Sequence, residues 1–257
     1  MLMDKNRKLF IAGNWKMNKT VAEAADLVKA LKRDLAGVRD VDIAVCPPFT
    51  ALHPVGQLLD NTSIKLGGQD LYWDKFGAFT GEVNAAMLKD VLCTYVIIGH
   101  SERRQFFHET NETVNKKTKA ALAARLKPIV CIGEMLAERE AGKTEAVVQD
   151  HVLNGLTGLS AEDLAEVTVA YEPVWAIGTG KTATSQQAQE VHAFIRKLLA
   201  QLSDSKTAAR VRIQYGGSVK PSNAHELMGQ PDVDGALVGG ASLTARDFVE
   251  IIQNVRK

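Results

Sequence analysis

The sequence has few cysteines, and none of them is placed to form a disulfide or a thiolate metal site. Only Cys46, Cys93 and Cys131 occur, far apart and each within an apolar run. An odd, dispersed set gives neither a disulfide framework nor a CxxC metal knuckle, and a buried thiol behaves as a small hydrophobic group. The six histidines are also dispersed, at positions 53, 100, 108, 151, 192 and 225. Without HxH or HExxH spacing they predict no metal site.

The sequence also lacks an excess of charge of one sign and any long hydrophobic run. Its 31 basic and 30 acidic residues leave a net charge of +1, which favours neither nucleic acid nor an anionic membrane as partner. The segment "MLMDKNRKLF" at the start is too short and too charged for a signal peptide, and no run is long enough to span a bilayer. We expect a cytoplasmic protein. Because Walker, GxGxxG and GxSxG motifs are missing, we expect no cofactor.

What the sequence does contain is eight short apolar runs separated by longer helical patterns. The runs are "KLFIAGNWK" from Lys8, "DIAVCP" from Asp42, "SIKLGGQD" from Ser63, "TYVIIGHS" from Thr94, "KPIVCIGE" from Lys127, "VTVAYEP" from Val167, "VRIQYGGS" from Val211 and "DGALVGG" from Asp234. Their cores are continuously apolar, as expected of parallel strands that are covered on both faces.

Amphipathic helices are predicted between these runs, the first over residues 21–36. Its apolar positions recur at steps of three and four, which places them on one face: Val21, Ala25, Val28, Leu31 and Leu35. Thr20 with Glu23 forms a capping box, and Gly37 suits the end of the helix. The pairs Thr184/Gln187 and Thr244/Asp247 repeat this start signal.

Strict alternation of strand and helix predicts an α/β fold with a parallel sheet. Eight repeats in 257 residues favour a closed, single eight-stranded parallel β/α barrel over an open doubly wound sheet of five to seven strands. Because no linker or low-complexity segment divides the chain, we expect residues 1–257 to form one domain.

The active site of such a barrel lies at the C-terminal ends of its strands, and ionisable residues and glycines gather there. These ends carry Asn14-Trp15-Lys16, Gly67-Gly68-Gln69-Asp70, Gly99-His100-Ser101-Glu102, Glu172, Gly216-Gly217-Ser218 and Gly239-Gly240. The strand starts carry only ordinary solvated charges such as Lys8 and Arg210.

The glycine pairs after the seventh and eighth strands are candidates for binding phosphate. Glycine lets backbone N–H groups approach an oxyanion, and the loops after these two strands are the common phosphate position in β/α barrels. One Gly-Gly turn alone is more often an ordinary tight loop, but two on adjacent strands favour a phosphate site.

Glu172 ends an apolar strand, and Pro173 restricts its backbone to an extended conformation. A salt-bridged carboxylate of structural importance is one interpretation. Desolvation at the mouth of the barrel would instead raise its pKa above the reference of ~4.3 and make it a base at neutral pH.

Three further residues at this rim carry chemistry. His100 precedes the predicted helix "SERRQFF", whose N-terminus disfavours an imidazolium, so a neutral imidazole is expected to donate to a carbonyl oxygen. Lys16 lies in "AGNWKMN" and supplies a positive charge for an oxyanion or a phosphate. For Glu102 two interpretations remain: an ion pair with Lys16, or an ion pair with Arg103 or Arg104.

A base, a neutral donor, an ammonium and a phosphate cradle suit proton abstraction next to a carbonyl in a small phosphorylated substrate. A metal-dependent sugar-phosphate epimerase on the same fold is a rival, but it needs histidine and acidic ligands on several strand ends. A catalytically inactive barrel that senses phosphate is another rival. It would tolerate loss of Glu172, His100 or Lys16, yet all three are present.

Several motifs resemble those of the triosephosphate isomerase family, in order and over nearly the whole chain. They are "GNWKMN", "GAFTGE", "IIGHSERR", "CIGE", "AYEPVWAIGTGKTAT", "YGGSV" and "ALVGGASL". The resemblance implies interconversion of dihydroxyacetone phosphate and glyceraldehyde 3-phosphate, a step of glycolysis and gluconeogenesis. The departures are a short N-terminal extension and the segment "LYWDKFGAFTGE".

The resemblance also implies roles for single residues. Glu172 matches the catalytic base, His100 the electrophile, and Lys16 with Asn14 the substrate-contacting pair, while Ser101 and Glu102 match supporting positions. Phosphate-contacting positions are matched by Gly178, Ser218, Gly239 and Gly240. Residues 174–184 match a mobile lid that would keep water from the intermediate.

The segment 71–82 is a connection that carries four aromatic side chains: Tyr72, Trp73, Phe76 and Phe79. Exposed on a monomer, they would form an apolar patch. One interpretation is that the segment folds back on its own barrel. The resemblance implies instead a homodimer in which Thr80 approaches Asn14 and Lys16 of the second subunit.

Overall fold

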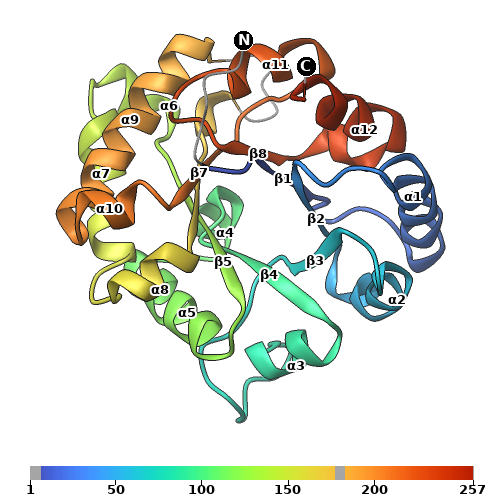
Figure 1. The fold of residues 1–257 in the computed structure, drawn as a ribbon. Coiled ribbons are helices and arrows are strands. Elements are labelled where there is room, and N and C mark those ends of the chain that lie inside the picture. Colours follow the sequence, from blue (N-terminus) through green and yellow to red (C-terminus); the bar gives the residue numbers. More distant parts are fainter. Residues whose placement is uncertain (1–6, 177–182, 257) are drawn as a thin grey trace.

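The computed structural model describes residues 7–176 and 183–256. Eight parallel strands close into a barrel in chain order, and the first strand pairs with the last (Figure 1). The strands are β1 (Phe10–Asn14), β2 (Asp42–Cys46), β3 (Ile64–Gly68), β4 (Cys93–Ile98), β5 (Lys127–Ile132), β6 (Thr168–Tyr171), β7 (Arg212–Tyr215) and β8 (Gly235–Val238). The prediction of an eight-stranded parallel barrel is confirmed.

Helices surround the barrel and separate consecutive strands (Figure 1). They are α1 (Val21–Asp34), α2 (Phe49–Leu59), α3 (Ala85–Asp90), α4 (Ser101–Phe106), α5 (Asn111–Ala123), α6 (Leu136–Glu140), α7 (Thr144–Gly155), α8 (Ala161–Glu166), α9 (Ser185–Leu202), α10 (Ser205–Ala208), α11 (Pro221–Met228) and α12 (Ala245–Asn254). Two short 3₁₀ turns, η1 (Val174–Ala176) and η2 (Gly240–Leu243), follow β6 and β8.

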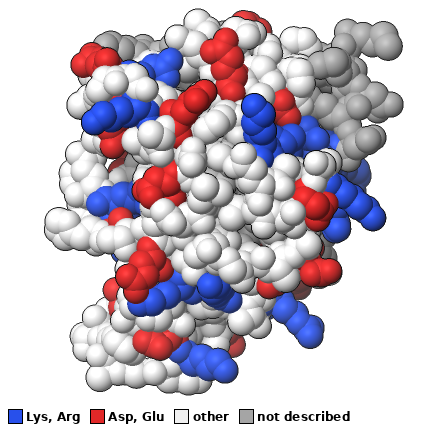
Figure 2. Space-filling view, turned by 90° about the vertical axis from the view of Figure 1, so that its left-hand side faces the viewer, with Lys and Arg blue, Asp and Glu red and all other residues white. Residues whose placement is uncertain are grey.

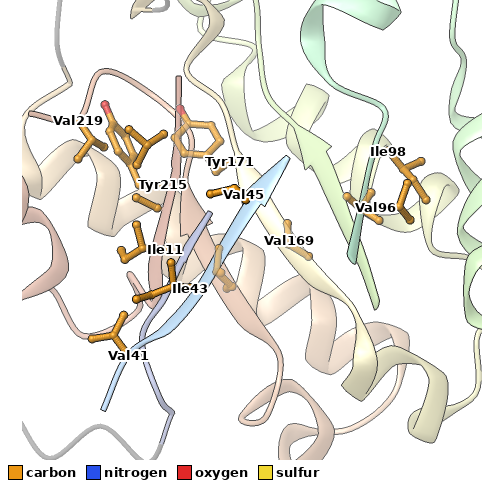
Figure 3. Packing of buried hydrophobic residues seen from close by; sticks show 14 of the residues in the cluster. Ile11, Val41, Ile43, Val45, Val96, Ile98, Val169, Tyr171, Tyr215 and Val219 are labelled. Carbon is orange, nitrogen blue, oxygen red and sulfur yellow. The ribbon is translucent and has the colours of Figure 1, made fainter. Parts of the chain in front are cut away.

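The strands are apolar on both faces because each face is buried against a different core. Alternate residues point into the barrel and form one cluster, made by Phe10, Ala12, Ala44, Cys46, Tyr95, Ile97, Ile129, Cys131, Ala170 and Leu237. The residues between them belong to a larger cluster that includes the helices, and Ile11, Ile43, Val96 and Val169 show this packing in Figure 3. Side chains therefore alternate between the barrel interior and the helix layer, but the sequence shows no alternation of polar and apolar residues because both sides are apolar.

The first helix illustrates how local signals set boundaries. Thr20 caps α1 with the predicted capping box, and Thr184 and Thr244 cap α9 and α12. The helix ends at Asp34 rather than at residue 36, and Gly37 lies two residues beyond its C-cap. Its buried face is Ala24, Leu27, Val28 and Leu31. The prediction that Val21 lies on this buried face is wrong, because the residue is 46% exposed.

The surface agrees with the balanced composition. On the face drawn in Figure 2, basic and acidic side chains are interspersed rather than gathered by sign. None of the helices in the described ranges is long and apolar enough to cross a membrane.

Candidate active site

A cavity of about 840 Å³ opens at the C-terminal end of the barrel. Its lining brings together seven of the residues that the sequence predicts for the site: Asn14, Lys16, His100, Glu172, Ser218, Gly239 and Gly240. They follow β1, β4, β6, β7 and β8. Because the strands of the barrel are parallel, their C-terminal ends lie at the same rim and bring these residues together. Gly178 and the central lid residues 177–182 lie outside the described residues.

Glu172 lies at the floor of this cavity with 2% of its surface exposed. Its backbone N–H continues the ladder by donating to the Ile132 carbonyl at 2.7 Å, and Pro173 ends the strand directly after it. Oε1 lies 2.8 Å from His100 Nε2, and Oε2 accepts the Ser101 backbone N–H at 2.9 Å. Both carboxylate oxygens are therefore held by the turn that follows β4.

His100 is the N-cap residue of α4 and is 5% exposed. Its Nδ1 accepts the Glu102 backbone N–H at 3.2 Å. A neutral imidazole that accepts at Nδ1 carries its hydrogen on Nε2, and Nε2 is the atom that faces Glu172. The helix start thus selects the tautomer that donates into the cavity.

The contact between Glu172 and His100 shifts the pKa values of both groups. Burial favours the neutral form of Glu172, but the adjacent His100, the Ser101 N–H and Lys16 outweigh it and lower the pKa of the carboxyl. Burial likewise disfavours the imidazolium, but Glu172 outweighs it and raises the pKa of His100. Burial of Glu172 was predicted correctly. The predicted raised pKa of Glu172 is wrong for this paired arrangement, and the pKa of His100 is raised rather than lowered, because the sequence did not reveal the contact.

Lys16 projects into the cavity from a left-handed backbone conformation with φ of 52°. Its N–H donates to Asn14 Oδ1 at 3.0 Å, and the Gln69 amide donates to its carbonyl at 2.9 Å. The ammonium lies 2.6 Å from Glu102 Oε1. This contact decides between the alternatives for Glu102, which pairs with Lys16 and also approaches His100 Nδ1 at 3.4 Å.

The two glycine pairs differ in what requires glycine. A Cβ on Gly216 would lie 2.8 Å from Glu172 Cγ, so this glycine gives room to the Glu172 side chain. Gly239 and Gly240 instead border open space: a Cβ on Gly239 would meet only Lys16 Cε, at 3.7 Å, and one on Gly240 would meet nothing within 4 Å. The open side near Lys16, at the start of η2, is therefore the one suited to an oxyanion.

Glu134, the last residue of "CIGE", belongs to this region, although the sequence did not predict a role for it. It is fully buried after β5 and accepts hydrogen bonds from the Tyr171 hydroxyl, the Trp175 indole and Arg139, at 3.0 to 3.1 Å. The Arg139 guanidinium also lies over the Trp175 ring at 4.4 Å. Its position at a strand end, like that of Glu172, was the available signal. It fixes Trp175 at the beginning of the predicted lid.

His151 supports the floor of the site from α7. Its Nδ1 accepts the Gly133 N–H at 3.3 Å, and Gly133 packs so closely on Glu172 that a Cβ there would lie 1.8 Å from the Glu172 carbonyl oxygen. Burial and the positive charge of Arg104 lower the pKa of His151 to about 4. The folded protein therefore binds fewer protons at this position than the unfolded chain between about pH 4 and 6.5.

This depressed pKa predicts an acid-dependent loss of stability. As pH falls from 6.5 towards 4, His151 is expected to remove about 1–3 kcal/mol from the free energy of unfolding. The amide oxygen of His151→Gln can still accept from the Gly133 N–H, but it does not titrate. In this variant the contribution of His151 to the slope of the free energy of unfolding against pH should disappear. Urea unfolding of both proteins at several pH values measures it, and equal slopes would show that His151 does not cause the acid sensitivity.

No group of three or more His, Cys, Asp or Glu side chains within the described part of the chain is arranged to hold a metal ion. The ligand set that the rival epimerase requires is therefore missing from these residues.

Comparison with known proteins gives one consistent family. The family model described as triosephosphate isomerase matches residues 9–255. Triosephosphate isomerases from Endomicrobium trichonymphae and Carboxydothermus hydrogenoformans are 56% and 58% identical, over 96% of this chain and 98% of each relative. The crystal structure of the Bartonella henselae triosephosphate isomerase superposes with a TM-score of 0.88 at 41% identity, covering 97% of this chain and 100% of the other. The chain belongs to the triosephosphate isomerase family.

Proposed function

We propose that the cavity interconverts dihydroxyacetone phosphate and D-glyceraldehyde 3-phosphate through an enediolate, with Glu172 as base, His100 as electrophile and Lys16 as electrostatic stabiliser. The reaction is that of the family to which the chain belongs. The observation that carries the residue roles is the 2.8 Å contact between Glu172 and His100 in a cavity that Lys16 also lines.

The chemistry follows from where these groups point. Glu172 removes a proton from the carbon beside the carbonyl, and the electron pair moves onto the carbonyl oxygen. His100 Nε2–H and the Lys16 ammonium then stabilise that oxygen. Glu172 returns the proton to the neighbouring carbon, while the proton of the substrate hydroxyl moves to the former carbonyl oxygen and the new carbonyl forms. The two carbons exchange oxidation level within one molecule, so the reaction needs no external oxidant or reductant.

In this structure both carboxylate oxygens of the proposed base, Glu172, already have partners within the protein. Its carboxylate is held by His100 and the Ser101 N–H. A substrate carbonyl between Glu172 and His100 would take over the imidazole hydrogen bond and separate the pair. Loss of the His100 contact removes the largest of the influences that lower the pKa of Glu172, while the Ser101 N–H and Lys16 remain. The pKa of the buried carboxyl therefore rises relative to the paired state, which makes it a stronger base during turnover.

The phosphate is proposed to lie against Lys16, Ser218, Gly239 and Gly240, with Asn14 fixing the Lys16 backbone. Gly239 and Gly240 leave open space there. By family resemblance Gly178 also contacts the phosphate and residues 174–184 act as a closing lid. Trp175, held by Glu134, forms the described beginning of that segment.

A coupled assay of glyceraldehyde 3-phosphate turnover in the presence of EDTA tests this function. Full turnover with the chelator is expected, because every proposed step uses side chains of this chain. Activity that disappears with EDTA and returns with a divalent metal would favour the epimerase class. Tight phosphate binding without turnover would favour an inactive, phosphate-sensing barrel.

We also propose that residues 1–257 act as one barrel domain in the cytoplasm. The pairing of β1 with β8 supports the first part, because the first and the last strand then belong to one closed sheet.

The protein is further proposed to work as a homodimer through segment 71–82. This segment projects beyond the ring of helices next to α3 (Figure 1). Its base is fixed, since Leu71 is buried and Tyr72 stacks on Trp73 at 4.1 Å. Its tip is not covered: Phe76 is 78% exposed and Phe79 39%. The segment thus packs partly on its own barrel and leaves its tip for a second copy, with Thr80 proposed to approach the other subunit's site.

Further exposed apolar side chains favour the same association. Met17, Phe106 and Phe107 are 96%, 62% and 63% exposed, and they follow β1 and β4 at the same end of the barrel as segment 71–82. A single exposed apolar residue is ordinary, but several at one end of the barrel are typical of an interface.

Light scattering is expected to give twice the mass of the chain for the wild type and a lower, concentration-dependent mass for Phe76→Asp. A charge at this tip would have to be buried in the dimer without a partner. Leu136→Asp, which changes a 40% exposed side chain in α6, is the control and should keep the wild-type mass. A wild-type monomer with full activity at every concentration would refute the homodimer.

A further inference from the structure

Arg104, the fourth residue of α4, turns its guanidinium back towards the turn that carries His100. Its Nε donates to the Gly99 carbonyl at 2.8 Å. The two terminal nitrogens donate to Asn111 Oδ1 at 2.8 Å and to the Cys131 carbonyl at 3.3 Å. All three acceptors are neutral, so this side chain is used for its geometry rather than for an ion pair.

The same residue holds the peptide groups on both sides of His100. The Arg104 backbone N–H donates to the His100 carbonyl at 3.0 Å, while its side chain holds the preceding carbonyl, that of Gly99. Gly99 has a left-handed φ of 69°, and a Cβ there would lie 2.7 Å from Val114 and 3.1 Å from the guanidinium. Arg104 thus fixes the backbone orientation of His100 in this tight turn by holding the carbonyl groups of Gly99 and His100.

The third contact joins this turn to the strand that anchors Glu172. Cys131, whose carbonyl Arg104 holds, is next to Ile132, whose carbonyl accepts the Glu172 N–H at 2.7 Å. One planar group therefore connects the end of β4, which carries His100, with the end of β5, on which Glu172 rests. Asn111 aims the guanidinium, and its own amide donates to Asp150 Oδ2 at 2.8 Å.

We propose that Arg104 is a positioning residue for the isomerisation, which sets the distance and angle between His100 Nε2 and the reacting oxygen. This inference rests on the role proposed above for His100. The adjacent Arg103 differs, because it pairs with the carboxylates of Asp70 and Glu109. Only the second arginine of "SERR" reaches under the catalytic turn.

Substitution of Arg104 by lysine tests the proposal. Lysine keeps the positive charge, but its ammonium cannot span the Gly99 and Cys131 carbonyls as a planar fork does. The Arg104→Lys protein is expected to lose roughly 10- to 100-fold in kcat, the cost of a catalytic group displaced by up to an ångström. KM should change far less, because the phosphate contacts remain in place.

Arg196→Lys is the matched control at the other end of the barrel. Arg196 also donates to two backbone carbonyls, those of Ala208 at 2.7 Å and Val211 at 2.9 Å, and it pairs with Asp234. Its substitution should lower the melting temperature while kcat per folded molecule stays at the wild-type value. A loss of kcat equal to that in Arg104→Lys would mean that any buried arginine has this effect, and would overturn the proposal.

A double-mutant cycle with His100→Gln shows whether Arg104 acts through His100. Arg104→Lys should reduce kcat in the wild type and change it little in the His100→Gln background. Equal losses in both backgrounds, or wild-type kcat in folded Arg104→Lys, would overturn the inference alone. Wild-type kcat in His100→Gln would overturn the role of His100 itself. If Arg104→Lys does not fold, Asn111→Ala takes its place in the cycle, with a smaller loss expected, because it releases the guanidinium together with the Asp150 contact and leaves Arg104 in place.

Discussion

Replacing Glu172 with glutamine is expected to lower kcat by about 10²- to 10⁴-fold, the usual contribution of a general base. The carboxamide has almost the same shape, but it cannot accept the proton from the carbon beside the carbonyl. KM should change little, because the phosphate contacts lie on other strands. Steady-state kinetics on protein of verified fold measure the effect.

Stability must be separated from catalysis here, since the substitution also removes the Glu172–His100 contact. Asp234→Asn is a matched control, because Asp234 is a fully buried carboxylate at the opposite end of the barrel that pairs with Arg7 and Arg196. It should destabilise the fold, as removal of one partner from a buried pair does, and leave kcat per folded molecule intact. Wild-type kcat in purified Glu172→Gln would show that another group is the base.

The barrel and its catalytic end could be predicted from the sequence because they depend on local signals. Continuous apolar runs identified the strands, and Thr184 and Thr244 identified helix starts. Once eight parallel strands are assigned, every strand end lies at one rim. A residue such as Glu172 or Lys16 can then be selected from its position in the chain alone.

The pairing of side chains across the site could not be predicted in this way. Glu172 and His100 follow β6 and β4, which are separated in the barrel by β5, and a contact across that gap depends on strand tilt and side-chain direction. The pKa directions of the two groups depend on that contact and were therefore missed. For the same reason Gly216 resembled a phosphate turn, although its neighbour in space is the Glu172 side chain.

Substitution of Lys16 by methionine is the second change from which we expect a large effect. Methionine keeps the length and apolar body of the side chain and removes only the positive charge. The lost charge would act on the developing oxyanion and on the phosphate, so kcat should fall and KM should rise. Removal of a preorganised electrostatic partner typically costs about 10²- to 10³-fold in kcat, so the combined loss in kcat/KM should exceed the change in either parameter.

Two comparisons decide whether this loss belongs to the charge at that position. Lys19→Met removes a lysine from the same loop, also left-handed with φ of 77°, that is not among the residues lining the cavity, and it should keep wild-type kinetics. With unphosphorylated glyceraldehyde the penalty of Lys16→Met should shrink, because only the oxyanion part remains. Equal losses of kcat/KM in Lys16→Met and Lys19→Met would show that the effect comes from destabilising the loop and not from the charge at position 16. If Lys16→Met loses as much activity with unphosphorylated glyceraldehyde as with the phosphorylated substrate, Lys16 stabilises only the oxyanion. A charge that also binds the phosphate must lose part of its effect when the phosphate is removed.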